Sequence, residues 1–598
     1  MVGVPGFEPG TSSSRTKRSA KLSYTPRAGF EATSADPDGE RNTRLAASAR
    51  CVRCLCARSK GFATMDSRRG GRLEDVPVLL RRGLRHALRP PRLPHPMTPR
   101  RAAATLLVVA ALCAVALAPD RGVAQQARLA EENSWLRVQN VGTLPATLDL
   151  TFYNRDGSPA AKDSCPKVGV CEAISPGSGR SFFQQTLEAL PKGYRGGGYL
   201  VGDQPFVAML ARDLIRPDGT LQLGGDSLRL GSGTERSFLP WVANTTSLVS
   251  RIAIENTSKD AGACVQIQYY PIGGLSPVAN DPGGGQSNCP SGGEYLAPRA
   301  SMVRDETTMT APFGFDGSAI VRTLATSTAV AASAQQISVA VDTRDRVRAG
   351  LSTYRALSQD EASRVVLLPM IDRATVEAGA SYTTRFRIFS ATPGAPNEVT
   401  LRFEGRDGSG AQVSIESKVT VFGSMTCDQS QPATLGCLPS DRTLPSTFTG
   451  SVRIQSVEPI TVVAQRLSST GSLSDYRGFT PGEASRQVVL PVINKNYGPF
   501  AGRAGWNSTF RVASFDGSTT YAYIVYYSKQ FPRGLFPDSP VPVDGSRTFS
   551  TLDEGKLPNN WVGSVVIVSD RPIVVVADLR SDVFEGDPEM IYNGVSLE

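Results

Sequence analysis

The chain has 598 residues and a formal net charge of +9. This length exceeds what one hydrophobic core supports, so several domains are expected. Residues 1–96 hold 19 of the 64 Lys and Arg and 8 of the 55 Asp and Glu, which leaves 45 basic and 47 acidic residues after them. The first segment thus carries +11 and the rest −2, so the basicity is local to residues 1–96 and says nothing about the partners of the rest. No nucleic-acid partner is expected.

Residues 1–96 are predicted to be a disordered basic preface that is not part of the functioning protein. The segment Gly6–Pro9 reads Gly-Phe-Glu-Pro, which resembles the T-arm of a transfer-RNA gene read as protein, so the preface resembles a miscalled start. Its three cysteines, Cys51, Cys54 and Cys56, have the spacing of half a metal site, and no second half follows.

A secretory signal peptide is predicted at residues 97–124. Two arginines follow shortly after Met97, the apolar run Ala102–Ala118 comes next, and small residues precede Gln125, the expected mature N-terminus. The run has 17 residues, which is short for a membrane span, so no span is expected after cleavage; an uncleaved anchor and a lipoprotein at Cys113 are the alternatives. These signals predict a secreted, extracellular or cell-surface bacterial protein.

A Pro-x-x-aromatic-x-Gly motif occurs four times after the signal peptide. Its glycines are 121, 133 and 113 residues apart, and the motifs begin at Pro191, Pro312, Pro445 and Pro558. Self-similarity at such a period is the signature of structural repeats. The predicted boundaries of the four repeats are 125–235, 236–360, 361–482 and 483–598.

Other landmarks keep the same period. Leu-Pro opens an apolar stretch at 239, 368 and 490, and Tyr354-Arg355 and Tyr476-Arg477 lie 122 residues apart. The segments Ser358–Arg364 and Thr480–Arg486 share Glu-Ala-Ser-Arg at matching positions and are predicted to be short linkers between repeats.

Each repeat is predicted to consist of β-strands. Stretches such as Arg385–Ile388 and Thr509–Val512 alternate with period 2 in β-branched and aromatic residues, and Gly and Pro are frequent, at 57 and 42 residues. No long amphipathic helical pattern occurs outside the signal region. The predicted fold class is therefore all-β, a tandem array of four two-sheet β-sandwiches.

Over residues 131–598 this pattern resembles the immunoglobulin-like or fibronectin type III-like repeats of secreted bacterial surface proteins. The resemblance implies Ig-like sandwiches that serve display and adhesion rather than catalysis. The Cys…Trp…Cys spacing of true immunoglobulin domains is absent.

Six cysteines follow the signal peptide, two in each of the first three repeats. Even numbers within separate units are typical of disulfides formed in an oxidising compartment. The predicted pairs are Cys165–Cys171, Cys264–Cys289 and Cys427–Cys437.

The residues expected for catalysis are scarce. Both histidines, His86 and His95, lie in the preface, so the 474 residues from Gln125 onward have no imidazole for a catalytic triad or a zinc site. No phosphate-binding or dinucleotide-binding glycine motif occurs. No enzyme activity, cofactor or metal is expected. The carboxylates Asp578, Asp582 and Asp587 match no calcium-loop spacing and are predicted to be solvated surface groups.

One strand of the fourth repeat departs from the others. Tyr521, Tyr523, Val525 and Tyr527 lie on the strand face that is polar in the first three repeats. The three tyrosines are candidates for a stacking platform that binds glycan or protein. The alternative is packing under a loop such as the Pro532–Pro542 stretch or against a neighbouring domain.

The predicted function is that of a non-catalytic secreted or cell-surface spacer or adhesion protein, with cell-wall glycan or another surface protein as partner. Two alternatives stay open. One is a carbohydrate- or cell-wall-binding protein that uses the tyrosines of repeat 4. The other is a secreted hydrolase with two carboxylates, which needs no histidine.

Overall fold

Strands dominate the computed structural model, and within the residues that it describes there is no α-helix. No helix among them is long and apolar enough to cross a membrane. The predicted signal peptide lies outside the described residues. Those residues are 18–23, 131–167, 171–216, 218–228, 233–282, 288–289, 292–324, 335–347, 350–377, 379–431, 437–439, 443–498, 505–536, 540–581 and 583–597.

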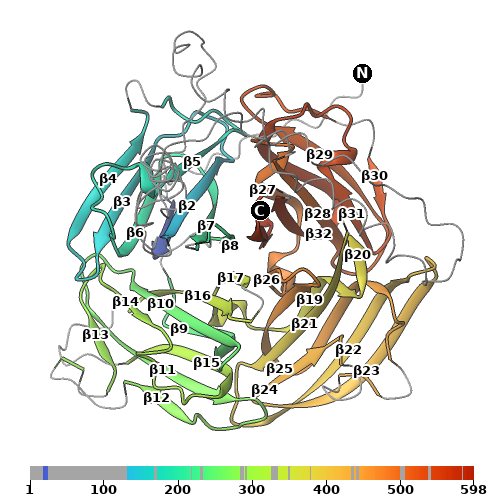
Figure 1. Ribbon diagram of the computed structural model, residues 1–598, viewed down its shortest axis with the longest axis horizontal. Coiled ribbons are helices and arrows are strands. Elements are labelled where there is room, and N and C mark those ends of the chain that lie inside the picture. The colour runs from blue at the N-terminus through green and yellow to red at the C-terminus, as the bar shows by residue number, and fades with distance from the viewer. Residues whose placement is uncertain are drawn as a thin grey trace, which may run out of the picture. The chain divides into compact units, whose positions relative to one another are not determined.

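The strands follow the four predicted repeats in order (Figure 1). Repeat 1 contains β2 (Glu131–Asn140), β3 (Leu148–Asn154), β4 (Pro159–Cys165), β5 (Gly179–Phe183), η1 (Gln184–Thr186), β6 (Gly196–Gly202), β7 (Phe206–Ile215) and β8 (Leu221–Ser227). Repeat 2 contains β9 (Arg236–Asn244), β10 (Leu248–Asn256), β11 (Ala263–Pro271), β12 (Ala279–Asp281), β13 (Glu294–Leu296), β14 (Ser301–Arg304), β15 (Phe315–Leu324), β16 (Ile337–Asp345), β17 (Gly350–Arg355) and β18 (Leu357–Ser358).

The second half of the chain is likewise built of strands. Repeat 3 follows η2 (Gln359–Glu361) and contains β19 (Ser363–Arg373), β20 (Thr375–Glu377), β21 (Ala380–Ser390), β22 (Pro396–Asp407), β23 (Gln412–Phe422), β24 (Ser424–Asp428), β25 (Phe448–Ser468) and β26 (Leu473–Arg477). Repeat 4 follows η3 (Pro481–Glu483) and contains β27 (Ser485–Lys495), β28 (Trp506–Ser514), β29 (Thr520–Tyr527), β30 (Val541–Val543), β31 (Ser546–Ser550), η4 (Thr551–Asp553), β32 (Trp561–Ser581), β33 (Gly586–Asp587), β34 (Glu589–Asn593) and β35 (Val595–Ser596).

One long strand joins two layers in each of repeats 3 and 4. The first half of β25 pairs with β19 and β22, and its second half pairs with β21 and β26. Residues from both sets of strands, such as Leu401 and Phe386, share one hydrophobic core. β32 is divided in the same way between β27 and β29 on one side and β28 and β34 on the other. The proline inside each long strand marks the change of layer.

The glycine of the recurring motif is a packing requirement. A Cβ on Gly450 would lie 2.2 Å from the Glu404 carbonyl oxygen and 2.7 Å from the Phe448 ring, the aromatic residue of the same motif. In repeat 4, Gly563 lies in the same way against the Tyr527 carbonyl and the ring of Trp561. The motif therefore packs its aromatic ring against its own glycine, where no side chain stands in the way.

Gly450→Ala is expected to destabilise the protein by at least about 2 kcal/mol, because the added methyl overlaps backbone atoms that belong to a paired strand. The midpoint of urea unfolding measures this change. Gly394→Ala is the matched control, since nothing lies within 4 Å of the added methyl. Equal midpoints for the two variants would contradict the packing role.

The recurring tyrosine closes a hydrogen bond within its repeat. Tyr354, Tyr476 and Tyr592 donate to the carbonyls of Trp241, Met370 and Val492, at 2.6, 2.5 and 2.5 Å. Each acceptor follows a Leu-Pro pair. The two landmarks found in the sequence therefore contact each other, and Tyr592 is the member that the sequence search missed.

The two predicted linkers are short and tightly held. Ser358 and Glu361 form a capping box at η2, and Thr480 and Glu483 form one at η3. Arg477 lies 3.2 Å from Glu483, and Arg355 pairs with Glu361 in the same way. A capping box and an ion pair therefore hold the first half of each segment.

The repeats do not form an open row. β8, β17, β26 and β34, one strand from each repeat, each contact the next, and β34 contacts β8. Repeat 1 supplies Met209, Ala211 and Leu223 to the core of repeat 4. Residues 131–598 accordingly fall in one compact unit. The four boundaries stay a prediction, and the sequence left the arrangement of the repeats open; in the structure their faces are partly buried against neighbouring repeats.

Two of the three carboxylates predicted to be solvated are buried in these contacts. Asp587 is fully buried, and its carboxylate accepts hydrogen bonds from the backbone of Leu351 and Leu473, in repeats 2 and 3. Asp578 is 2% exposed and pairs with Arg466 of repeat 3. Asp582 lies outside the described residues.

Six residues of the predicted preface form a strand. β1 (Arg18–Ser23) pairs antiparallel with β6 of repeat 1, where the sequence predicts disorder. The other residues of 1–96 lie outside the described part of the chain.

Candidate functional site

A cleft of about 1430 Å³ lies between the first and the last repeat. One wall is the sheet of repeat 1 in the order β5-β2-β7-β8, and the other comes mainly from β27 and β32 of repeat 4. Alternation along β2 turns Leu136 and Val138 into the core of repeat 1 and leaves Trp135 and Arg137 on the face toward repeat 4. The closure of the repeats thus creates the cleft.

Aromatic side chains line both walls. Trp135 and Phe183 are cross-strand neighbours on repeat 1 with ring centroids 6.1 Å apart. Trp506 and Phe584 form a second pair on repeat 4, at 5.7 Å. The chain has four tryptophans, and the other two are buried, 1% and 2% exposed. The two less buried tryptophans therefore both lie in this cleft.

Polar groups stand between the aromatic pairs. Burial raises the pKa of Asp213 to about 6. Asn494 is only 4% exposed, and within the described residues its Oδ1 has no hydrogen-bond partner, as is also true of Oδ1 of Asp213. Arg137 donates from Nε to the Pro491 carbonyl at 3.2 Å and from an Nη to the Ser181 hydroxyl at 3.4 Å. Large apolar rings with a few fixed polar groups are typical of ligand sites.

The predicted tyrosine stripe is split by the fold. Tyr521 and Tyr523 are 50% and 51% exposed. Val525 and Tyr527 are covered by the loop at Gly534, and Tyr527 also packs on Gly177 of repeat 1. Two tyrosines therefore remain open to a partner, while the third belongs to the contact between repeats 1 and 4.

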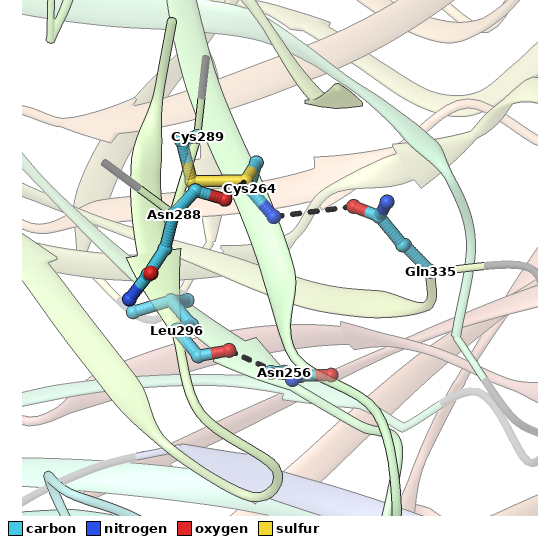
Figure 2. Close-up of a disulfide and its surroundings, with 6 residues drawn as sticks. All are labelled: Asn256, Cys264, Asn288, Cys289, Leu296 and Gln335. Carbon is cyan, nitrogen blue, oxygen red and sulfur yellow. Dashed lines mark hydrogen bonds between the residues drawn. A yellow bond between two sulfur atoms is a disulfide. The ribbon is translucent and has the colours of Figure 1, made fainter. Parts of the chain in front are cut away.

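Two of the three predicted disulfides are present, Cys264–Cys289 and Cys427–Cys437. Figure 2 shows the first, where the Cys264 amide donates to Gln335 at 3.1 Å and Asn256, the last residue of β10, donates to Leu296 at 3.1 Å. The bond ties β11 to the loop before β13.

The third predicted disulfide is not formed. Cys165 is buried and Cys171 is half-buried, and both are free thiols. The two thiols interact with each other, and their sulfurs also contact backbone carbonyls of Glu172 and Ser164, at 2.9 and 3.5 Å. Burial raises the pKa of Cys165 to about 12, which keeps this thiol protonated and unreactive.

The intact mass of the exported protein is therefore expected to lie four hydrogens below the fully reduced value. One alkylating label is expected to react slowly at Cys171 in the folded protein, and a second only in denaturant, because Cys165 is buried. Peptide mapping after labelling measures both. A mass six hydrogens below the reduced value would restore the third disulfide.

Within the described residues, no three His, Cys, Asp or Glu side chains gather at a distance suited to a metal ion. Among the described residues that line the cleft, the carboxylates are Glu172 and Asp213.

The sequence search missed the cleft residues. A signal was present: Trp135-Leu-Arg137-Val aligns with Arg385-Phe-Arg387-Ile of repeat 3, which places a tryptophan on a face that elsewhere carries a polar residue. The meeting of residues 135 and 506 depends on closure of the repeats and could not be found from local pattern.

No family model matches the chain, and no curated protein matches it. Among solved structures, the chain is 14% identical to a protein described as a tetra-tandem repeat in the extending region of a large adhesion protein; the match covers 79% of this chain and 97% of that one, with a TM-score of 0.08. At that TM-score the likeness carries no argument about fold or function.

Proposed function

We propose that this chain is an exported, non-catalytic carbohydrate-binding adhesion protein, built of four Ig-like β-sandwich repeats, whose ligand site is the cleft between repeats 1 and 4. The observation that carries the proposal is the pair of facing aromatic walls, Trp135 with Phe183 and Trp506 with Phe584. Sugar rings present apolar C–H faces that stack on aromatic rings, and their hydroxyls need hydrogen-bonding groups at the rim.

A binding role fits the closed arrangement better than a spacer role does. A spacer gains length from repeats that contact only their neighbours in the chain. Here the last repeat contacts the first through β33 and β8, where Gly586 pairs with Leu221. This contact shortens the array of repeats and encloses a surface between repeats 1 and 4.

Tryptophan fluorescence tests the proposal directly, because two of the four tryptophans line the cleft. The full exported protein is titrated with chitin, xylan, cellulose and peptidoglycan oligosaccharides and with uronate oligosaccharides. Binding of at least one is expected to shift the emission. Phe584→Ser is expected to weaken that ligand at least about tenfold, since one stacking ring is lost.

Phe313→Ser is the matched control, because Phe313 is 72% exposed in repeat 2 and is not one of the residues that line the cleft. It is expected to leave binding unchanged. The double variant Tyr521→Ser with Tyr523→Ser is also expected to bind normally; loss of binding there, with Phe584→Ser unaffected, would move the site to the tyrosines. Cleavage of an oligosaccharide that stops on Asp213→Asn would favour the hydrolase alternative and overturn the non-catalytic role.

A further inference from the structure

Three repeats carry an arginine at one register position. Arg137, Arg387 and Arg511 pair with Met209, Val463 and Val576 on the next strand of their sheets. Those three partners pair in turn with β8, β26 and β34, the strands through which the repeats contact one another. Repeat 2 has Ala253 there. Each of the three arginines reaches toward another repeat: Arg387 to repeat 2, Arg511 to repeat 3 and Arg137 to repeat 4.

Two of these arginines find a carboxylate across the interface. Arg387 is held by Asp316 through two nitrogens, at 2.8 and 3.0 Å. Arg511 lies 3.5 Å from Asp372. Both also donate to the carbonyl of the motif glycine, Gly317 or Gly450.

Repeat 4 has no acidic residue at either of these positions. Asp372 is paired with Thr449 across β19 and β25, and the corresponding pair across β27 and β32 is Asn494 with Val562. Asp316 of repeat 2 stands at the position of Val562. Arg137 therefore faces Asn494 and Val562, at the positions where the other two interfaces have Asp372 and Asp316. Asn494 and Val562 both line the cleft.

Arg137 consequently lacks a carboxylate partner among the described residues. It is 9% exposed, and burial lowers its pKa to about 10, so it is still a cation at neutral pH. A carbonyl and a hydroxyl satisfy two of its five N–H groups. A buried cation without an anion is costly, and an anion from outside would relieve that cost.

We propose that Arg137 binds the carboxylate of an acidic sugar, so that the cleft selects glycans that contain uronic acids. This inference rests on the proposed function. The planar guanidinium fork matches a carboxylate. Lys167 and Lys529 are exposed on the cleft lining, and among the described lining residues they and Arg137 and Arg180 outnumber the carboxylates, which favours anions.

The experiment compares each uronate tetramer, of galacturonate, glucuronate, guluronate or mannuronate, with its own methyl ester. The ester keeps the sugar and removes the charge. The full-length exported protein is expected to bind at least one acid about tenfold to a hundredfold more tightly than its ester, as measured by calorimetry in 0.1 M salt.

Asn494→Asp is the decisive variant. It creates the carboxylate that Asp372 supplies in repeat 3, so it is expected to pair with Arg137, raise the melting temperature and abolish the preference for the acid. Arg137→Met is expected to abolish the preference as well, without lowering the melting temperature. Asn507→Asp, on the neighbouring strand and outside the cleft lining, is the matched control and is expected to keep the preference.

The outcomes separate the inference from the proposed function. Equal binding of acid and ester, with Phe584→Ser still weakening both, overturns the Arg137 site and leaves the cleft. Binding of no oligosaccharide at all overturns both. If Arg137→Met unfolds, Lys529→Ala carries the test: a several-fold smaller preference supports the inference, and an unchanged preference overturns it.

Discussion

Replacing Arg466 with methionine is expected to destabilise the protein by about 3–5 kcal/mol, the largest effect of any single substitution considered. Arg466 is 1% exposed and lies 2.9 Å from Asp372 of its own repeat and 2.9 Å from Asp578 of repeat 4. Glu377 and Glu589 complete the cluster at 2.5 and 3.5 Å.

The cause is the charge that the substitution leaves behind. Three of the four carboxylates are at most 3% exposed, and without the guanidinium they would be buried anions next to one another. Burial already raises the pKa values of Asp578 and Glu589, and loss of Arg466 would raise them further. The loss of stability caused by Arg466→Met should therefore become smaller as the pH falls and the carboxylates become protonated.

Urea unfolding at pH 7 and pH 5 measures both effects. Arg571→Met is the matched control, because Arg571 and its partner Asp516 are each about half exposed. An exposed pair contributes about 1 kcal/mol or less. If Arg466→Met unfolds at the same urea concentration as this control, the cluster does not hold repeats 3 and 4 together.

The sequence predicted the strands and their repetition but not their assembly. The all-β fold follows from alternation and from the motif glycines, which depend on contacts within one repeat. Tyr354 and Tyr476 were found as a pattern because Arg follows both, whereas Tyr592 was missed because Asn593 takes the place of the arginine. Contacts within a repeat could therefore be predicted wherever the same residues recur at the repeat period.

Contacts between repeats were not visible in the same way. Strand β8 is buried along its whole length although it contains Gln222 and Asp226. From these polar residues the sequence alone suggests an exposed strand. Asp226 accepts from Arg477, 251 residues further along the chain. Such partners become apparent only when the repeats close on one another, and the cleft arises from the same closure.

The buried carboxylate of Asp475 is expected to make the protein less stable as the pH rises. Asp475 lies on the central strand β26 and is 2% exposed. Burial raises its pKa to about 7, the nearby charge of Asp226 adds to the increase, and Arg385 opposes it. In the unfolded chain its pKa returns to the ordinary value near 3.8.

The direction of the pH dependence follows from the proton that Asp475 binds in the folded state. Because the folded state holds the proton more tightly, its stability is highest below about pH 4 and falls as the pH rises from there through about 7. The full difference is about 4 kcal/mol, at 1.36 kcal/mol for each pKa unit. Asp475→Asn keeps the neutral side chain at every pH, so it is expected to stabilise the protein by only about 1 kcal/mol at pH 4.5 and by about 2–4 kcal/mol at pH 8.

Unfolding in urea at pH 4.5, 6 and 8 follows the difference between the two proteins. Asp260→Asn is the control, because Asp260 is exposed, and its effect is expected to stay small at all three values. A destabilised Asp475→Asn protein at pH 8 would mean that the closed repeats require the charged carboxylate. A gain that grows with pH would instead show that the centre of the assembly tolerates this acid only in its neutral form, so that closure of the repeats, and with it the cleft, weakens in alkaline surroundings.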